Sequence, residues 1–344
     1  MAITLPKDWA DSFKVKQGHY LLVDDTDTGV LKLITRSQGE VPPRVCVINA
    51  ASCEAPNMLS RMVVGAYLVG HEMIWIQSRM RLKPEHVREL EELMVSLVGL
   101  HLTEQTENLI VMESLADPSK PTMDNSIRRL HLITSFMREK VLRALIEGAA
   151  NDLSNVLSMG KEAQRVYWLA VRQLLSSVDD RRLAQTLGIR SQCWLLGDRA
   201  VLAVLKAIVN CTEAIAREGA KLQDLGFSSQ SDALSEISRF DASIADVSEG
   251  AICALMTLDV ARANRVIESI KSLDEDTKKV MDRLSETIQT PGCRRSVWSV
   301  IYAFDEIIRG YRTIAEIAIN RALEESGDYA SVDVGSLTKP QLSK

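Results

Sequence analysis

The stretch VWSVIYAFDEIIRGYRTIAEIA, residues 297–318, decides the fold class. Its apolar residues recur every three or four positions, at Val297, Ile301, Phe304, Ile308, Tyr311, Ala315 and Ala318. A second stretch has the same spacing, at Val266, Ile270, Leu273, Thr277, Val280 and Leu284. An apolar period near 3.5 residues is typical of long helices that pack lengthwise against one another. We therefore expect nearly parallel or antiparallel helices in this part of the chain.

Helical patterns extend from this stretch back to Asp117 and forward to about Ser326. The predicted helices cover residues 122–149, 151–178, 192–219, 231–257, 259–289 and 293–325. Weak matches between the two halves, such as Asn155-Val156-Leu157 with Arg265-Val266-Ile267, indicate an internal repeat of three helices. The prediction is two tandem three-helix bundles, at residues 118–226 and 227–328, followed by a polar tail at 329–344.

A short β-rich segment, residues 1–38, begins the chain. After the apolar Ala2–Leu5, Pro6 opens a helical turn, as proline does at a first helical position. Two predicted strands, Tyr20–Val23 and Val30–Ile34, are joined by an acidic turn that ends in glycine. The segment is too short for a core of its own, so we expect it to dimerise or to lean on its neighbour.

Residues 39–117 form a predicted α/β connector module. Strands are expected at 45–48 and 73–77, helices at 56–68 and 84–98, and a terminal hairpin at 100–103 and 109–112. The whole chain is thus predicted to be mainly α, with a small β-rich segment and an α/β module before the bundles.

The charge balance excludes a strongly basic nucleic-acid binder. The 344 residues include 46 acidic and 41 basic side chains, a net charge of −5, so any polyanion binding requires a local patch. With no signal sequence and no apolar run of about 20 residues, we expect a cytoplasmic protein without membrane insertion. The six cysteines never stand two residues apart, which favours small buried hydrophobes in a reducing compartment over a zinc or redox motif.

No residue pattern favours an enzyme. The five histidines never form a His-x-x-x-His pair, and His71-Glu72 lacks the second histidine of a zinc protease motif. Ser158–Lys161 looks like the end of a phosphate loop, but it lacks the upstream glycine and falls inside a predicted helix. We therefore expect neither catalysis nor a cofactor.

Three features of the helical half stand out: VYWLAVRQLL at 166–175, GDRAV at 197–201, and Asp259 seven residues before Val266. In these features the helical half resembles the PhoU family of phosphate-uptake regulators. The resemblance implies two tandem three-helix bundles. It also implies a role in phosphate uptake or phosphate homeostasis.

The N-terminal segment ITLPKDWA, residues 3–10, resembles the AbrB/SpoVT-like swapped-hairpin DNA-binding domain. Residues 73–76 and 82–86 resemble the connector of archaeal proteins that join such a domain to a PhoU domain. The resemblance implies a homodimer that binds promoter DNA. Because the family begins with another strand, we expect this domain to be N-terminally incomplete. The candidate DNA contacts, balanced by five aspartates, are Lys7, Lys14, Lys16, Lys32 and Arg36.

PhoU proteins often hold metal clusters on acidic pairs four residues apart, a spacing that puts both side chains on one helix face. The corresponding positions here are Lys206 and Asn210 in the third long helix, and Asp305 and Arg309 in the sixth. A cationic side chain repels a metal ion, so we predict no metal cluster. Two other readings remain open. One is an adaptor that docks phosphate ABC transporter subunits or a sensor kinase without touching DNA, and the other is a metal-storing PhoU protein.

Overall fold

The computed structural model describes residues 4–26, 30–35, 43–147, 150–227, 232–324 and 329–330. The chain divides into two compact units, the first unit at residues 1–44 and the second unit at 45–344. The two are described separately below.

The first unit consists of a short helix and a hairpin. Helix α1 covers Lys7–Ser12, and strands β1 (Leu21–Thr26) and β2 (Val30–Thr35) pair antiparallel, as expected from two strands joined by a turn. The predicted connecting turn lies partly outside the described residues. No side chain whose burial is described in this unit is buried, and Phe13, Tyr20 and Val23 are 56%, 88% and 54% exposed. The described part of the first unit therefore has no core of its own.

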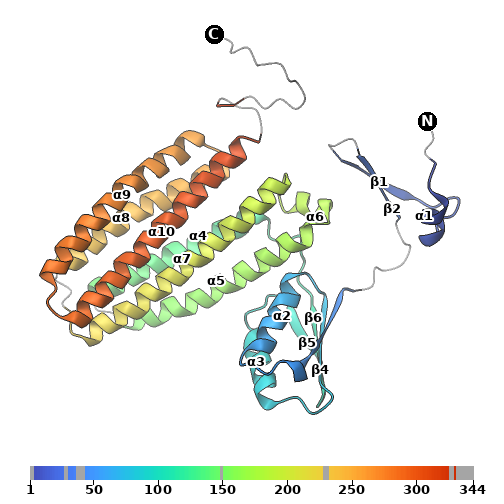
Figure 1. Ribbon diagram of the computed structural model, residues 1–344, viewed down its shortest axis with the longest axis horizontal. Coiled ribbons are helices and arrows are strands. Elements are labelled where there is room, and N and C mark those ends of the chain that lie inside the picture. Colours follow the sequence, from blue (N-terminus) through green and yellow to red (C-terminus); the bar gives the residue numbers. More distant parts are fainter. Residues whose placement is uncertain are drawn as a thin grey trace, which may run out of the picture. The chain divides into compact units, whose positions relative to one another are not determined.

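The helical part of the second unit contains the six predicted long helices, which confirms the mainly α fold (Figure 1). They are α4 (Met123–Glu147), α5 (Ala150–Ser177), α7 (Gln192–Asp224), α8 (Asp232–Thr257), α9 (Val260–Thr287) and α10 (Pro291–Ala322). A short helix α6, Arg181–Thr186, interrupts the loop expected between α5 and α7. Its N-cap is Asp180, whose side chain accepts a hydrogen bond from the amide of Leu183.

The two sets of three helices share one hydrophobic core. Helices α4, α5 and α7 pack pairwise, as do α8, α9 and α10, while α7 packs along α10 and α4 contacts α8 (Figure 1). All seven residues of the seam in 297–318 are buried. Gly310 allows the close approach of α10 to α7, because a Cβ there would lie 3.0 Å from Val204 Cγ1. The two three-helix repeats thus form one continuous helical bundle with a shared core.

The α/β module, residues 45–114, carries a four-stranded sheet in the order β3-β4-β6-β5. Strands β3 and β4 are parallel and the other pairs antiparallel. The strands are β3 (Val45–Asn49), β4 (Met73–Gln77), β5 (Leu100–Gln105) and β6 (Leu109–Ser114), with α2 (Met58–Leu68), α3 (Pro84–Met94) and a 3₁₀ turn at Ala50–Ser52. The helix predicted to reach residue 98 ends at Met94, and Gly99, with a positive φ of 76°, leads the chain from the following turns into β5.

All six cysteines are free. Cys53 and Cys293 are buried as predicted, but Cys193 is exposed in the first turn of α7, so the expectation of burial is wrong there. In the described residues, no helix is long and apolar enough to cross a membrane.

A buried arginine joins the α/β module to the helical part. Arg172 on α5 donates from Nη1 to the carbonyl oxygens of Tyr67 and His71, the latter at 3.0 Å. Its guanidinium lies 4.7 Å from the centre of the Tyr67 ring, and the neighbouring Trp168 packs on the module's core. Burial lowers the pKa of Arg172 and raises that of Tyr67 to about 12.

Replacing Arg172 with methionine is expected to lower the free energy of unfolding by about 2–3 kcal/mol, because two buried carbonyl groups lose a charged donor. Urea denaturation of the full chain, followed by circular dichroism, measures the change. The matched control is Arg129→Met, since Arg129 forms an exposed ion pair with Glu162 and its loss should cost less than about 1 kcal/mol. Equal effects of the two substitutions would show that Arg172 does not hold the module.

Candidate functional site

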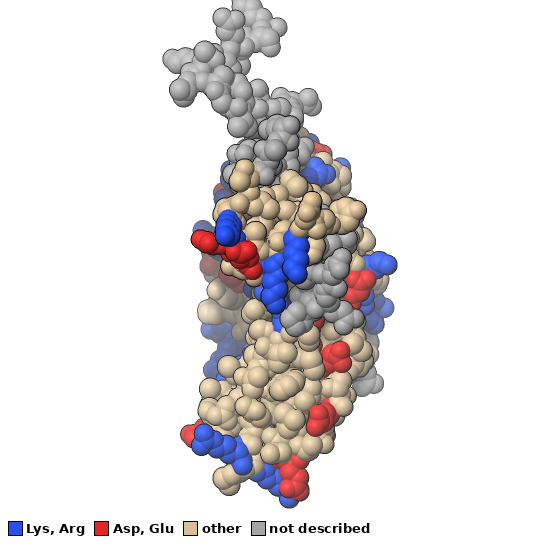
Figure 2. Space-filling view, turned by 90° about the vertical axis from the view of Figure 1, so that its right-hand side faces the viewer, with Lys and Arg blue, Asp and Glu red and all other residues tan. Residues whose placement is uncertain are grey.

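The candidate DNA contacts lie in the first unit. Lys7, Lys14 and Lys16 are exposed on α1 and on the loop that follows it. Lys32 lies on β2, where the register pairs it with Asp24, and Arg36 lies outside the described residues. Three of the five predicted basic residues therefore lie close together in the sequence, on one short helix and its following loop. On the face shown in Figure 2, basic and acidic side chains are interspersed over a largely uncharged surface.

At the positions that correspond to metal-binding pairs in PhoU proteins, this chain has cationic side chains beside the acidic or polar ones. On α10, Arg309 Nε donates to Asp305 Oδ2 at 2.9 Å and so engages the carboxylate. On α7, burial lowers the pKa of Lys206, and Glu213 opposes that shift. Among the residues described, no group of three or more His, Cys, Asp or Glu side chains is arranged to hold a metal ion.

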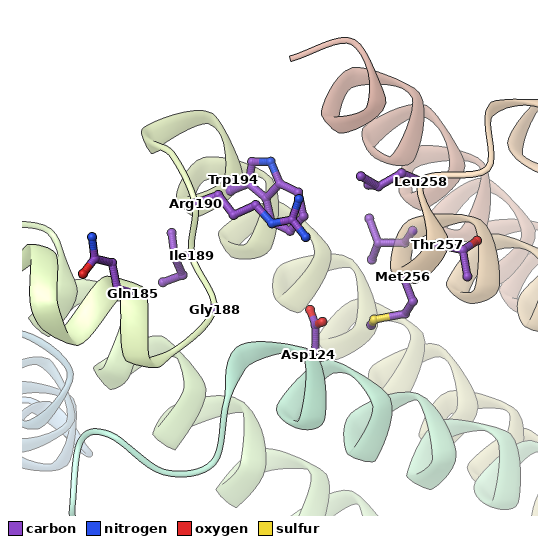
Figure 3. Close-up of a pocket in the computed structure, with 10 residues that line it drawn as sticks. Asp124, Gln185, Gly188, Ile189, Arg190, Trp194, Met256, Thr257 and Leu258 are labelled. Carbon is purple, nitrogen blue, oxygen red and sulfur yellow. The ribbon is translucent and has the colours of Figure 1, made fainter. Parts of the chain in front are cut away.

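A cleft of about 600 Å³ opens where α4 and α7 begin and α8 ends (Figure 3). Arg190 lies over Trp194, 4.6 Å from the centre of one of its rings, and Asp124 lines the same cleft. Gly188 takes a positive φ of 85° in the turn that carries Arg190 toward the cleft. A bare anion bound at Arg190 would also meet the Asp124 carboxylate, so the cleft favours a partner group that both donates and accepts hydrogen bonds.

A buried ion pair connects α7 to α10 beside this cleft. Arg321 Nη2 donates to Asp198 Oδ1 at 2.6 Å, and the two side chains are 1% and 3% exposed. The Arg321 guanidinium also lies 4.7 Å from a Trp194 ring centre. Burial raises the pKa of Asp198 to about 6, although Arg321 acts in the opposite direction. The Asp198 carboxyl group is thus paired with the Arg321 guanidinium inside the bundle.

A second polar cluster connects α4 to α8 and α10. Arg138 on α4 forms a buried ion pair with Asp241 on α8. His131 Nδ1 lies 3.3 Å from the Tyr311 hydroxyl, and His131 Nε2 lies 3.6 Å from a carboxylate oxygen of the largely exposed Glu249. Burial lowers the pKa of His131, and Arg138 adds to that effect, while Glu249 opposes it. These contacts join the two sets of three helices.

His131 predicts acid destabilisation. Because its folded-state pKa lies below the unfolded value of about 6.5, the unfolded chain binds more protons in this range. Titration of His131 therefore lowers the free energy of unfolding when the pH is below its lowered pKa, and this destabilisation disappears as the pH rises through 6.5. Between pH 7.5 and pH 5.5, the urea midpoint of the natural chain should fall further than the midpoint of the His131→Gln variant. The control His101→Gln, at an exposed position, should leave that pH difference unchanged; an unchanged difference in His131→Gln would contradict the assignment.

The sequence reasoning identified none of the buried charged pairs. A signal was present, since Arg321 follows the apolar seam of α10 by three residues, at the spacing of a core position. Its partner Asp198 lies in the GDRAV stretch. That stretch contributed to the resemblance to PhoU proteins, but the sequence did not reveal its structural role.

Comparison with known proteins identifies the fold. No protein-family model and no curated protein matches the sequence. Among solved structures, PhoU from Pseudomonas aeruginosa is 15% identical, with a TM-score of 0.50 over 57% of this chain and 93% of that one. The phosphate transport system regulatory protein PhoU from Streptococcus pneumoniae is 10% identical, with a TM-score of 0.50 over 60% of this chain and 96% of that one. The chain therefore contains a helical bundle of the PhoU type.

Proposed function

We propose that this chain is a non-enzymatic regulator of phosphate uptake and phosphate homeostasis, and that it acts on transcription through its first unit. The observation that supports this most is the almost complete coverage of two PhoU structures, one of them a phosphate transport system regulatory protein. In this proposal the helical part receives the phosphate signal or docks a partner. The first unit carries the response to promoter DNA.

The exposed apolar side chains of the first unit support the proposed homodimer. Its described side chains bury no core, and Phe13, Tyr20 and Val23 remain exposed. A second copy would cover these side chains and double the lysines available to phosphate groups. The resemblance of residues 3–10 to the AbrB/SpoVT-like domain supports the same arrangement.

Fluorescence anisotropy tests the proposal with labelled duplexes from the phosphate-transport promoters of the host. The full chain should bind them more tightly than shuffled duplexes of the same composition, with an affinity that falls as salt is added. Equal affinity for both duplexes, or no binding at low salt, would disprove transcriptional control through the first unit.

The mixed charge of the first unit favours one alternative function, an adaptor for phosphate ABC transporter subunits or a sensor kinase. Asp8 and Asp11 lie with Lys7 on α1, and the strand register places Asp24 opposite Lys32 in the hairpin. A full chain carrying Lys7→Glu, Lys14→Glu and Lys16→Glu separates the two functions. An adaptor would still regulate phosphate uptake after these substitutions, whereas a DNA-dependent regulator would not.

A further inference from the structure

An apolar groove of about 940 Å³ runs between α7 and α10, with α9 at one side. Ala214 and Cys211 contribute from α7, and Met281 contributes from α9. From α10 come Trp298, Tyr302 and Ala303. This volume and this lining, mostly apolar with a few polar groups at the margin, are those of sites that bind small molecules.

Two aromatic side chains stand exposed in the groove. Trp298 and Tyr302 lie one turn apart on α10 and are 41% and 63% exposed. Other aromatic side chains of the same helix, Phe304 and Tyr311, are buried in the shared core. Large aromatic side chains beside an apolar floor gain free energy when a ligand covers them, because that removes apolar surface from water.

The two ends of the groove differ in charge. Arg294 and Arg295 lie at the end where α10 begins, and no side chain caps that N-terminus, so its dipole adds positive potential. Glu218 also lies at this end, but it is paired with Lys221 at 2.6 Å, and Lys221 and Arg295 together lower its pKa, so cationic groups outnumber this one carboxylate. At the other end lies Glu306, fifteen residues along α10 from Pro291, or about 22 Å. An anionic group would therefore be favoured at the arginine end and disfavoured at the other.

We propose that the groove binds a free amphipathic anion of the fatty-acid class. The carboxylate lies at Arg295, and the acyl chain extends along Trp298 and Tyr302 toward Glu306. The groove is elongated and apolar, which suits an acyl chain, and its single cationic end suits one anionic head. This site is independent of DNA binding and of the polar cleft at Arg190.

Displacement of a fluorescent probe tests the site in the full chain. The amphipathic anion 8-anilinonaphthalene-1-sulfonate is bound first, and is then displaced with laurate, with uncharged dodecanol or with dodecyltrimethylammonium. Laurate should displace the probe at lower concentration than the other two compounds. Equal potency of the three compounds, or no displacement, would overturn the proposal.

Substitutions locate the binding. Trp298→Ala should weaken laurate binding about tenfold, whereas Phe136→Ala, at an aromatic side chain 56% exposed on α4, should leave it unchanged. Arg295→Glu should weaken laurate binding about fivefold and leave dodecanol unaffected, since only the head loses its partner. Arg295 is chosen over Arg294 because Arg294 Nε donates to the carbonyl oxygen of Ile288 at 3.0 Å and so supports the fold.

Two outcomes would contradict this site. If Trp298→Ala and Phe136→Ala behave alike, the probe binds elsewhere. If the full chain sediments with phosphatidylglycerol vesicles through Trp298 but does not bind free laurate, the groove contacts a membrane lipid and the proposed free ligand is wrong. Circular dichroism and equal urea midpoints verify that each variant is folded.

Discussion

Replacing Arg321 with methionine is expected to lower the free energy of unfolding of the helical bundle by about 3–5 kcal/mol. The reason is that Asp198, 3% exposed, would remain in the interior without its cationic partner. Gly197 beside it approaches α10 so closely that a Cβ would lie 3.4 Å from Arg321 Nε, which leaves little room for water. Urea denaturation at pH 7.5, followed by circular dichroism, measures the loss.

Two further variants separate the buried pair from a general effect of losing an arginine. Arg312→Met removes an exposed ion pair with Glu316 on the same helix and should cost less than about 1 kcal/mol. Arg321→Met combined with Asp198→Leu should recover much of the lost stability, because no unpaired charge remains. A double variant as unstable as Arg321→Met alone would contradict this explanation and indicate a packing role for the arginine stem.

Reversing three charges in the first unit should strongly weaken promoter binding. In a dimer, Lys7→Glu, Lys14→Glu and Lys16→Glu together remove six phosphate contacts. The affinity is then expected to fall by at least about 100-fold, and the slope of log K against log salt by about five. Anisotropy titrations with the promoter duplex between 50 and 200 mM salt measure both quantities.

The matched control changes the net charge by the same amount at exposed lysines of the second unit, Lys83→Glu, Lys161→Glu and Lys278→Glu. This control should retain most of the affinity. If both triple variants lose affinity equally, the binding reflects overall charge, and the lysines of the first unit are not its contacts.

The long helices could be predicted from the sequence because their apolar spacing is regular and repeats over many turns. All seven residues of the predicted seam are buried, and the buried face of α10 is wider than the seam, since it also includes Val300, Ile307 and Ile314. The strands of the α/β module could be placed because short apolar runs stand between glycine and proline. Periodicity of this kind depends on local sequence alone, so a single chain suffices to detect it.

The features that the sequence did not predict depend on contacts between distant residues. Arg138 and Asp241 are 103 positions apart, and Arg321 and Asp198 are 123 apart, so nothing local reveals either pair. The continuous core across α7 and α10 likewise depends on how the two repeats dock, which helical spacing leaves open. The groove at Trp298 arises from three helices at once. Helix α6 was missed because six residues carry too little periodicity to distinguish a helix from a turn.

The central claim is that this chain regulates phosphate uptake by binding promoter DNA, and its occupancy on the host chromosome tests that claim most directly. Chromatin immunoprecipitation of the full chain, in phosphate-rich and phosphate-limited cells, should show enrichment at phosphate-transport promoters that changes with phosphate supply. The enrichment should be lost in the chain with Lys7→Glu, Lys14→Glu and Lys16→Glu. Occupancy spread evenly over the chromosome, or unchanged by those three substitutions, would contradict the proposal.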